Sequence, residues 1–337
     1  MDTATAHTAH TASTSPPATD AARLDPRLVT VVMRTIGGRP REIRRAIASV
    51  AASSWRPVEV VVVYQGSEDA QWADIQRLPH EFAAIPVRAL RNANTGDRRA
   101  ENLNIGWEAG NGRYLGFLDD DDTLEPQHLP LLVDAMEASG RAWAYGQVVL
   151  RKEDEALAQV SESRPFRRHR FSLQSLWNEN FLPIHSLLID RSRLAPPLRA
   201  RPVCEELDRS EDWDFLLRLA FAHEPAVVEA FTCTYHVSTG ERNTNLSLMA
   251  AGASPEREQR NREAWARCKT LVEQRKASLI APLWWAREHF NLPEAPAPAQ
   301  APTQAPGQPE ASVVAVPVVS FRRRAVRKLI RMLERLL

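Results

Sequence analysis

Short apolar runs alternate with amphipathic stretches through the first half of the chain. The runs cover residues 28–33, 58–63, 87–90 and 114–118, and a helical pattern over residues 98–109 precedes the last of them. Runs this short and this apolar are typical of strands that are buried on both faces of a parallel sheet. Strands that alternate with helices at this spacing predict an α/β fold with a mostly parallel central sheet flanked by helices.

Four consecutive aspartates, Asp119–Asp122, end the fourth run abruptly. Ligands of open α/β sheets collect at the carboxyl ends of the strands, which is where these acids are expected. Four crowded carboxylates are costly unless a cation or hydrogen-bond donors neutralise them. A divalent metal with oxygen ligands would do so. An acidic turn in solvent, or the start of a helix, explains the same residues without a metal.

The composition narrows the class of protein. A net charge of +1 over 337 residues gives no general attraction to nucleic acid. Three cysteines, Cys204, Cys233 and Cys268, lie far apart and form no metal-ligand pattern, which fits a reducing compartment. The chain has no apolar run long enough for a membrane span and no secretory signal pattern, so we expect a cytoplasmic protein.

The ends of the chain differ in composition from its centre. Residues 1–26 are small and polar without hydrophobic periodicity, and we expect them to be disordered. We expect residues 251–292 to form a helical extension, residues 293–318 a Pro/Ala-rich linker, and residues 319–337 a basic amphipathic helix. The globular domain is therefore expected over residues 27–250.

Several segments resemble, in order, the motifs of glycosyltransferase family 2. They are residues 29–35, 46–50, 60–67, 102–106, 112–122 and 211–219. The resemblance covers residues 28–245 and implies a GT-A-like fold. It also implies a metal-dependent, hexosyltransferase-type enzyme of cell-envelope polysaccharide biosynthesis. Such an enzyme moves a sugar, with inversion, from a nucleotide-diphosphate donor to a hydroxyl of a glycan or glycolipid.

The resemblance implies that Asp119, Asp120 and Asp121 form the family's DxD motif. Asp121 is the expected ligand of a divalent metal, Mg²⁺ or Mn²⁺, and such an ion can neutralise a departing diphosphate. Asp119 or Asp120 would contact the ribose of the donor or a metal-bound water. Asp122 is expected only to cap the following helix.

Sugar transfer also needs a base that takes the proton from the acceptor hydroxyl. Asp212 is the expected base, because the neighbouring acid Glu211 would raise its pKa toward the useful range. The same pair opens a predicted helix, where acids are favoured without any catalytic role. Trp213 would either stack on a sugar or pack in the core.

The remaining expected site residues concern the donor. Thr35 is expected to line the base pocket, and Gln65, which stands where the family often has an acid, can offer amide hydrogen bonds. Arg98 is expected to contact the donor, with a surface salt bridge as the alternative. His236 would lie near the diphosphate or metal, or serve the structure alone. Tyr64 is expected to be a buried strand-end tyrosine rather than a stacking partner for the base.

Two rival functions remain open from the sequence. A nucleotidyltransferase on a similar fold would want a Gly-rich, Lys-bearing loop after the first strand, and residues 37–40 contain no lysine. A catalytically inactive glycan- or nucleotide-binding scaffold is suggested by the altered Tyr64-Gln65 turn. The expected tail helix, residues 319–337, would either dock its apolar face on a protein or lie on an anionic membrane surface. We favour peripheral contact with the inner face of the cell membrane, because that suits an enzyme acting on a lipid-linked glycan.

Overall fold

The computed structural model describes residues 24–94, 96–167, 170–239 and 255–280. The strands are β1 (Asp25–Thr35), β2 (Val58–Gln65), β3 (Val87–Asn92), β4 (Gly112–Asp119), β5 (Thr123–Leu124), β6 (Trp143–Glu153), β7 (Gln159–Ser163), β8 (Leu187–Asp190) and β9 (Ala226–Ser238). The helices are α1 (Pro40–Ala51), α2 (Asp69–Ile75), α3 (Leu78–Glu81), α4 (Arg99–Ala109), α5 (His128–Ser139), α6 (Leu173–Asn178), α7 (Glu211–Ala222) and α8 (Pro255–Ile280).

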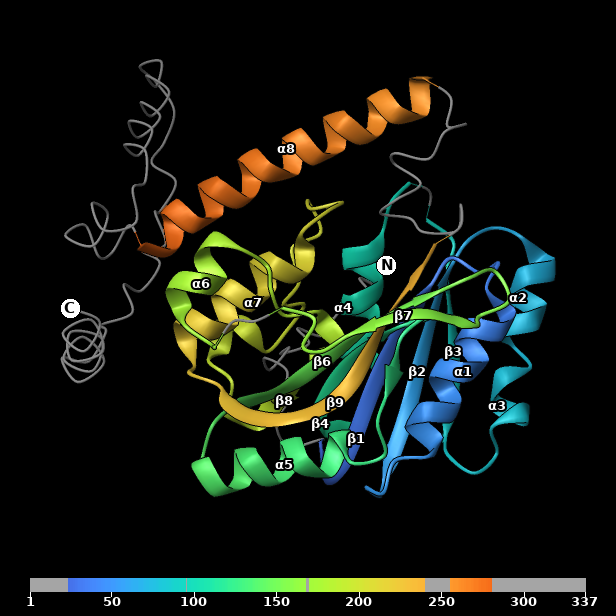
Figure 1. The fold of residues 1–337 in the computed structure, drawn as a ribbon, viewed down its shortest axis with the longest axis horizontal. Helices are drawn as coiled ribbons and strands as arrows, with labels where there is room; N and C mark the ends of the chain where they lie inside the picture. The colour runs from blue at the N-terminus through green and yellow to red at the C-terminus, as the bar shows by residue number, and fades with distance from the viewer. Residues whose placement is uncertain (1–23, 95, 168–169, 240–254, 281–337) are drawn as a thin grey trace, which may run out of the picture. The chain divides into compact units, whose positions relative to one another are not determined.

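Within the described residues, the strands form one nine-stranded sheet in the order β3-β2-β1-β4-β8-β6-β9-β5, with β7 paired to β6 (Figure 1). β1 pairs in parallel with both β2 and β4, and β3 pairs in parallel with β2. This half confirms the expected α/β class. The other half is mixed, because β8 runs antiparallel to β4 and to β6. Parallel pairing therefore holds for the first four strands and does not extend across the whole sheet.

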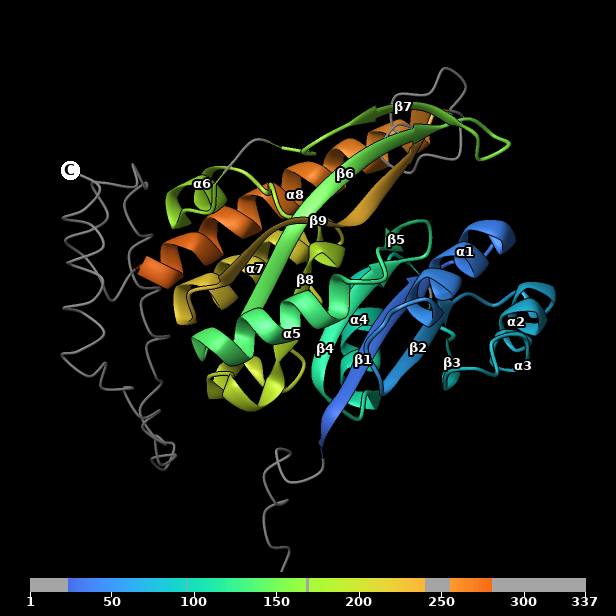
Figure 2. The ribbon, with the colours of Figure 1, turned by 60° about the horizontal axis from the view of Figure 1, so that its bottom comes forward.

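Helices cover both faces of the sheet, and each face has its own hydrophobic core (Figure 2). One core joins the sheet to α1 and α5 through residues such as Ile47 and Leu132. The other joins the sheet to α4, α6 and α7, and contains Trp107, Trp177 and Phe215. The parallel strands are thus buried on both sides, which explains why their sequences are almost continuously apolar.

The helical extension is represented by α8, whose Cys268 and Val272 pack with Leu207 in a third small core. Within the described part of the chain, no helix combines the length and the apolarity that a bilayer span requires. The expected disordered segment lies almost entirely outside the described residues, although β1 already begins at Asp25. The Pro/Ala-rich linker and the tail helix lie outside them as well.

Candidate active site

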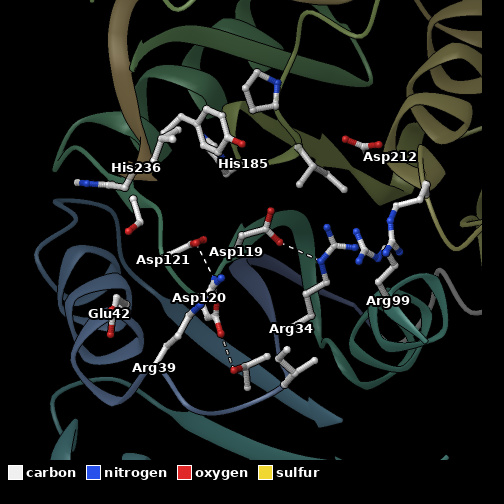
Figure 3. A pocket seen from close by; sticks show the side chains of 18 of the residues that line it. Arg34, Arg39, Glu42, Arg99, Asp119, Asp120, Asp121, His185, Asp212 and His236 are labelled. Carbon is white, nitrogen blue, oxygen red and sulfur yellow. Dashed lines mark hydrogen bonds and ion pairs between the residues drawn. The ribbon is translucent and has the colours of Figure 1, made fainter. Parts of the chain in front are cut away.

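A cavity of about 1060 Å³ opens where β1, β2 and β4 end. Its lining contains every site residue expected from the sequence except Arg98. These residues are Thr35, Gln65, Asp119, Asp120, Asp121, Glu211, Asp212, Trp213 and His236. Figure 3 shows Asp119 and Asp212 on different sides of this cavity. The fold therefore brings the acidic loop after β4 and the acidic start of α7 to one place.

Arg34, at the end of β1, is the link between these two acidic segments. Its Nε donates to Oδ1 of Asp119 at 2.9 Å, and its Nη1 donates to Glu211. Burial by itself would raise the pKa of Asp119, but the charge and hydrogen bond of Arg34 hold that pKa below its ordinary value. Asp119 is therefore ionised and already paired with a cation of the chain.

Arg39, just before α1, takes the corresponding place at the next two aspartates. Its Nη1 donates to Oδ1 of Asp120 at 3.0 Å and to Oδ2 of Asp121 at 2.6 Å. Oδ2 of Asp120 accepts the Thr35 hydroxyl at 2.5 Å. Burial and the carboxylates of Asp122 and Asp120 raise the pKa of Asp121 well above its ordinary value. Arg39 thus balances only part of the negative charge around Asp121.

The carboxylates of Asp119 and Asp121 retain oxygens suited to a metal. Arg34 and Arg39 each use one oxygen, and the other makes no hydrogen bond to the described residues. Among the residues that the structure describes, no three His, Cys, Asp or Glu side chains form a metal-binding group. Mg²⁺ is usually held by one or two carboxylates together with waters and substrate phosphates. The donor set therefore fits a metal that binds together with a nucleotide.

Asp122 does not cap a helix, and that expectation is wrong. The two-residue strand β5 follows it, and α5 has Gln127 at its N-cap position. Oδ1 of Asp122 accepts the backbone N–H of His236 at 2.8 Å, and its Oδ2 lies 2.7 Å from Nδ1 of His185. Burial would lower the pKa of His185, yet the adjacent Asp122 charge raises it well above its ordinary value. Asp122 therefore anchors the acidic loop to the interior.

Asp212 stands at the start of α7 with its carboxylate in the cavity (Figure 3). Its Oδ2 accepts a hydrogen bond from Nδ2 of Asn180 at 2.9 Å, and its Oδ1 accepts the Trp213 backbone N–H at 2.8 Å. Burial and the charge of Glu211 raise the pKa of Asp212 to about 6. Ser210, which directly precedes α7, has a φ of +61°, a left-handed conformation that is typical of strained functional segments. The geometry gives a carboxylate that can accept a proton near neutral pH.

The expected donor contacts of Gln65 and Arg98 are arranged differently. The Gln65 side chain donates to the Gly96 carbonyl and accepts hydrogen bonds from the Arg98 backbone N–H and from Asn102, each at 3.2 Å. It thereby fixes the loop before α4. The Arg98 side chain is 46% exposed and lies 3.7 Å from Glu101, whereas its neighbour Arg99 lines the cavity.

Three other expected residues are held by the protein itself. His236 has its two ring nitrogens 2.7 Å from Glu153 and 2.9 Å from Thr123, which favours a structural role. Trp213 donates through Nε1 to the Leu176 carbonyl at 2.6 Å, and Nζ of Lys276 lies 3.9 Å from its ring centre. Tyr64 is fully buried and stacks on Trp72 at 6.0 Å, as expected for a structural tyrosine.

Sequence reasoning did not single out Arg34, Arg39, His185 or Asn180. The two arginines flank Thr35 at the end of the first strand, and this position is the one signal that the sequence offered for them. Arginines at that edge of a parallel sheet are expected to face the acids that end the adjacent strand. His185 and Asn180 carry no comparable local signal.

The family model for glycosyl transferase family 2 matches residues 30–193. Succinoglycan biosynthesis protein ExoO of Rhizobium meliloti is 33% identical over 145 residues, which are 42% of this chain and 39% of that protein. Glucosyl-dolichyl phosphate glucuronosyltransferase of Haloferax volcanii is 29% identical over 112 residues, which are 33% of this chain and 34% of that protein. The chain thus matches well under two thirds of the length of these curated relatives.

Among solved structures, mannosyltransferase PcManGT from Pyrobaculum calidifontis, in complex with GDP-Man and Mn²⁺, is 15% identical with a TM-score of 0.47. That likeness covers 80% of this chain and 77% of the mannosyltransferase. The family match agrees with the GT-A-like α/β fold and with the order of the motifs along the strands. Residues 30–193 of this chain therefore form a domain that belongs to glycosyl transferase family 2.

Proposed function

We propose that the protein transfers a sugar from a nucleotide-diphosphate donor to a hydroxyl of a glycan or glycolipid, with inversion at the anomeric carbon. In this proposal Asp212 is the base that accepts the proton of the acceptor hydroxyl. The acceptor oxygen attacks the anomeric carbon from the face opposite the diphosphate, and the carbon–oxygen bond to the diphosphate breaks. The acceptor is thereby glycosylated, and the nucleoside diphosphate is released.

One observation carries the proposal: Asp212 shares its cavity with the aspartates after β4 while lying on another side of it. Its pKa of about 6 suits a general base at neutral pH. This separation supports an acceptor side at Asp212 and a donor side at the aspartates, as a single displacement requires.

The donor side is assigned to the acidic loop and to the residues around it. Asp120 is tied to Thr35 at 2.5 Å, so the two side chains form a fixed polar wall for the nucleoside. Asp121 and Asp119 would hold a divalent metal through their remaining oxygens, and a bound Mg²⁺ or Mn²⁺ supplies charge neutralisation for the diphosphate. Arg99 lines the same cavity and offers a further cation for a phosphate.

The names of the two curated relatives support a glycan or lipid-linked acceptor. One is named for succinoglycan biosynthesis, and the other for a transfer to glucosyl-dolichyl phosphate. We propose on that basis that this chain acts in polysaccharide biosynthesis of the cell envelope. The proposed location, in the cytoplasm at the inner face of the membrane, follows from the expected tail helix.

A scaffold without turnover is the second candidate, and one observation favours it. The Gln65 amide, expected to contact the donor, is already committed to Gly96, Arg98 and Asn102. A scaffold would bind a nucleotide sugar without releasing a nucleoside diphosphate, so the two candidates differ in turnover and agree in donor binding.

The decisive experiment is a panel of UDP-, GDP- and dTDP-sugars screened by thermal shift with and without Mn²⁺. A donor present at 100 times its Kd stabilises the fold by about 2.7 kcal/mol. Release of nucleoside diphosphate from the stabilising donor, with cell-envelope glycans as acceptors, then measures turnover. Stabilisation without release would favour the scaffold, and an absence of stabilisation by every donor would contradict both candidates. If the Asp121→Ala variant kept the full Mn²⁺-dependent stabilisation by the donor, the assignment of Asp121 as a metal ligand would be wrong.

A further inference from the structure

Arg39 stands between two of the carboxylates that the proposed function assigns to the donor and its metal. A single nitrogen, Nη1, lies 3.0 Å from Asp120 and 2.6 Å from Asp121. The Arg39 side chain is 18% exposed, and those of Asp120 and Asp121 are 8% and 31% exposed, so the contact is partly buried. One guanidinium thus bridges two neighbouring acids at the point where β4 ends.

The two bridged acids differ in what else they bind. Both carboxylate oxygens of Asp120 accept hydrogen bonds from the chain, Oδ1 from Arg39 and Oδ2 from Thr35. Asp121 meets Arg39 through Oδ2 and keeps its Oδ1 without a hydrogen bond to the described residues. A divalent ion at Asp121 would bring two positive charges close to the guanidinium, and like charges repel more strongly in a partly buried site than in bulk water.

The loop before Arg39 is packed at Gly37, where a Cβ would clash with the Gln71 side chain, and open at Gly38. Gly37 and Gly38 precede Arg39 with φ values of +78° and +77°, a region that glycine enters without strain. A Cβ placed on Gly38 would meet nothing within 4 Å, so this side of the loop is open. The backbone that carries Arg39 is therefore not packed against other elements at that glycine.

We infer that Arg39 is a built-in counter-ion of Asp120 and Asp121, which a divalent cation must displace and which a diphosphate then receives. The inference rests on the proposed function. Arginine matches phosphate oxygens through its planar set of donors, so a diphosphate gives the displaced guanidinium a favourable new partner. Metal and diphosphate binding are consequently coupled through Arg39, and each strengthens the other.

The experiment measures Mn²⁺ affinity by electron paramagnetic resonance, with and without inorganic pyrophosphate as the probe for the diphosphate. The protein forms are the full-length chain, Arg39→Met and Arg39→Lys. Arg39→Met should bind Mn²⁺ about tenfold more tightly than the natural chain when pyrophosphate is absent. Pyrophosphate should tighten Mn²⁺ binding in the natural chain, after correction for Mn²⁺ bound to free pyrophosphate, and much less in Arg39→Met. Arg39→Lys keeps a positive charge and should fall between the two.

Arg44→Met is the matched control, since Arg44 lies on α1, which Arg39 directly precedes, and also pairs with two acids, Asp74 and Glu81, but does not line the cavity. It should leave Mn²⁺ binding unchanged. Equal Mn²⁺ affinity of the natural chain and both Arg39 variants would overturn the inference while leaving the metal assignment intact. If neither the natural chain nor Arg39→Met bound Mn²⁺, with or without pyrophosphate, the inference would fail together with the metal part of the proposed function. The proposed role of Asp212 in sugar transfer is tested separately, by measuring the release of nucleoside diphosphate.

Discussion

Arg34 and Asp119 are register partners in adjacent parallel strands, and a hydrogen bond of 2.9 Å joins their side chains at the carboxyl edge of the sheet. The same guanidinium also binds Glu211 at the start of α7. Because Asp212 follows Glu211 directly, this arginine sets the position of the proposed base relative to the acidic loop. A single residue at the end of β1 therefore holds together the two halves of the cavity.

Replacing Arg34 by Met should destabilise the fold by about 3–5 kcal/mol, because the change leaves the buried Glu211 and the partly exposed Asp119 without their cation. The Glu211 side chain is only 3% exposed, so water cannot replace the lost partner. Urea unfolding measures the effect. The Arg34→Met/Glu211→Gln double variant should recover part of the loss. Arg44→Met removes a more exposed ion pair and should cost about 0–1 kcal/mol; an equal cost for both arginines would contradict the argument.

Asp212→Asn should lower kcat by about 10²–10⁴-fold, the usual contribution of a positioned general base. The amide keeps the shape of the side chain and can still accept from Asn180, so donor binding in the thermal shift assay should be unchanged. Asp134→Asn, an exposed change on α5, is the control and should leave kcat unaltered. A variant at position 212 with the kcat of the natural chain would exclude this residue as the base.

The pH profile of transfer should follow the ionisation of Asp212. The base acts when deprotonated, and its pKa is raised to about 6. The rate should therefore fall as the pH drops below about 6 and level off above it. Initial rates between pH 4.5 and 8, expressed as kcat/KM, measure the profile. The residual activity of Asp212→Asn should lack this fall in rate at low pH. If the fall were unchanged in that variant, it would arise from the ionisation of another group.

The same raised pKa predicts a stability cost for the ionised residue. An unfolded aspartate titrates near pH ~3.9, and the folded one at about 6. Between these values the folded state retains a proton that the unfolded chain has lost, so stability falls as the pH rises through this window. Asp212→Asn should thus melt at a higher temperature than the natural chain above pH 6, with no difference near pH 3.5. Each 1 kcal/mol corresponds to about 2–4 °C in a domain of this size. Equal Tm values of Asp212→Asn and the natural chain at pH 7.5 would contradict a stability cost of the ionised Asp212.

The predicted tail helix, residues 319–337, should bring the protein to anionic membranes. Flotation with vesicles that contain phosphatidylglycerol should carry the full chain upward, and removal of residues 319–337 should abolish this. Neutral vesicles are the control, and added salt should weaken the binding because it screens the arginines. Equal flotation of the two forms would leave the membrane role without support and favour docking on a protein.

The first four strands of the sheet and the cavity at their carboxyl ends were predictable from the sequence. The run at residues 114–118 is apolar along its whole length and the run at residues 58–63 is apolar except for Glu59, and they became the buried centres of β2 and β4. Positions at strand ends placed Thr35 and Asp121 near one another without further information. The mixed half of the sheet was harder to predict, because strand direction depends on pairing partners that local periodicity does not reveal.

The partners of the acids were not predictable in the same way. Crowded carboxylates require neutralisation, and the sequence left open whether a metal or hydrogen-bond donors provide it. The structure pairs Asp119 with Arg34, bridges Asp120 and Asp121 through Arg39, and places Asp122 against His185. The chain supplies these cations itself, and the arrangement still leaves oxygens for a metal.

The sequence by itself determined the succession of strands and helices up to β4, the family, and the presence of acids at the end of β4, because these follow from local periodicity and local motifs. Only the tertiary structure decided which cation faces which acid. The ion pairs join residues that are far apart along the chain, such as Arg39 and Asp121, 82 positions apart, or Arg34 and Glu211, 177 positions apart. Charge pairing over such separations depends on how the strands and α7 pack, and no short segment of the sequence contains that information.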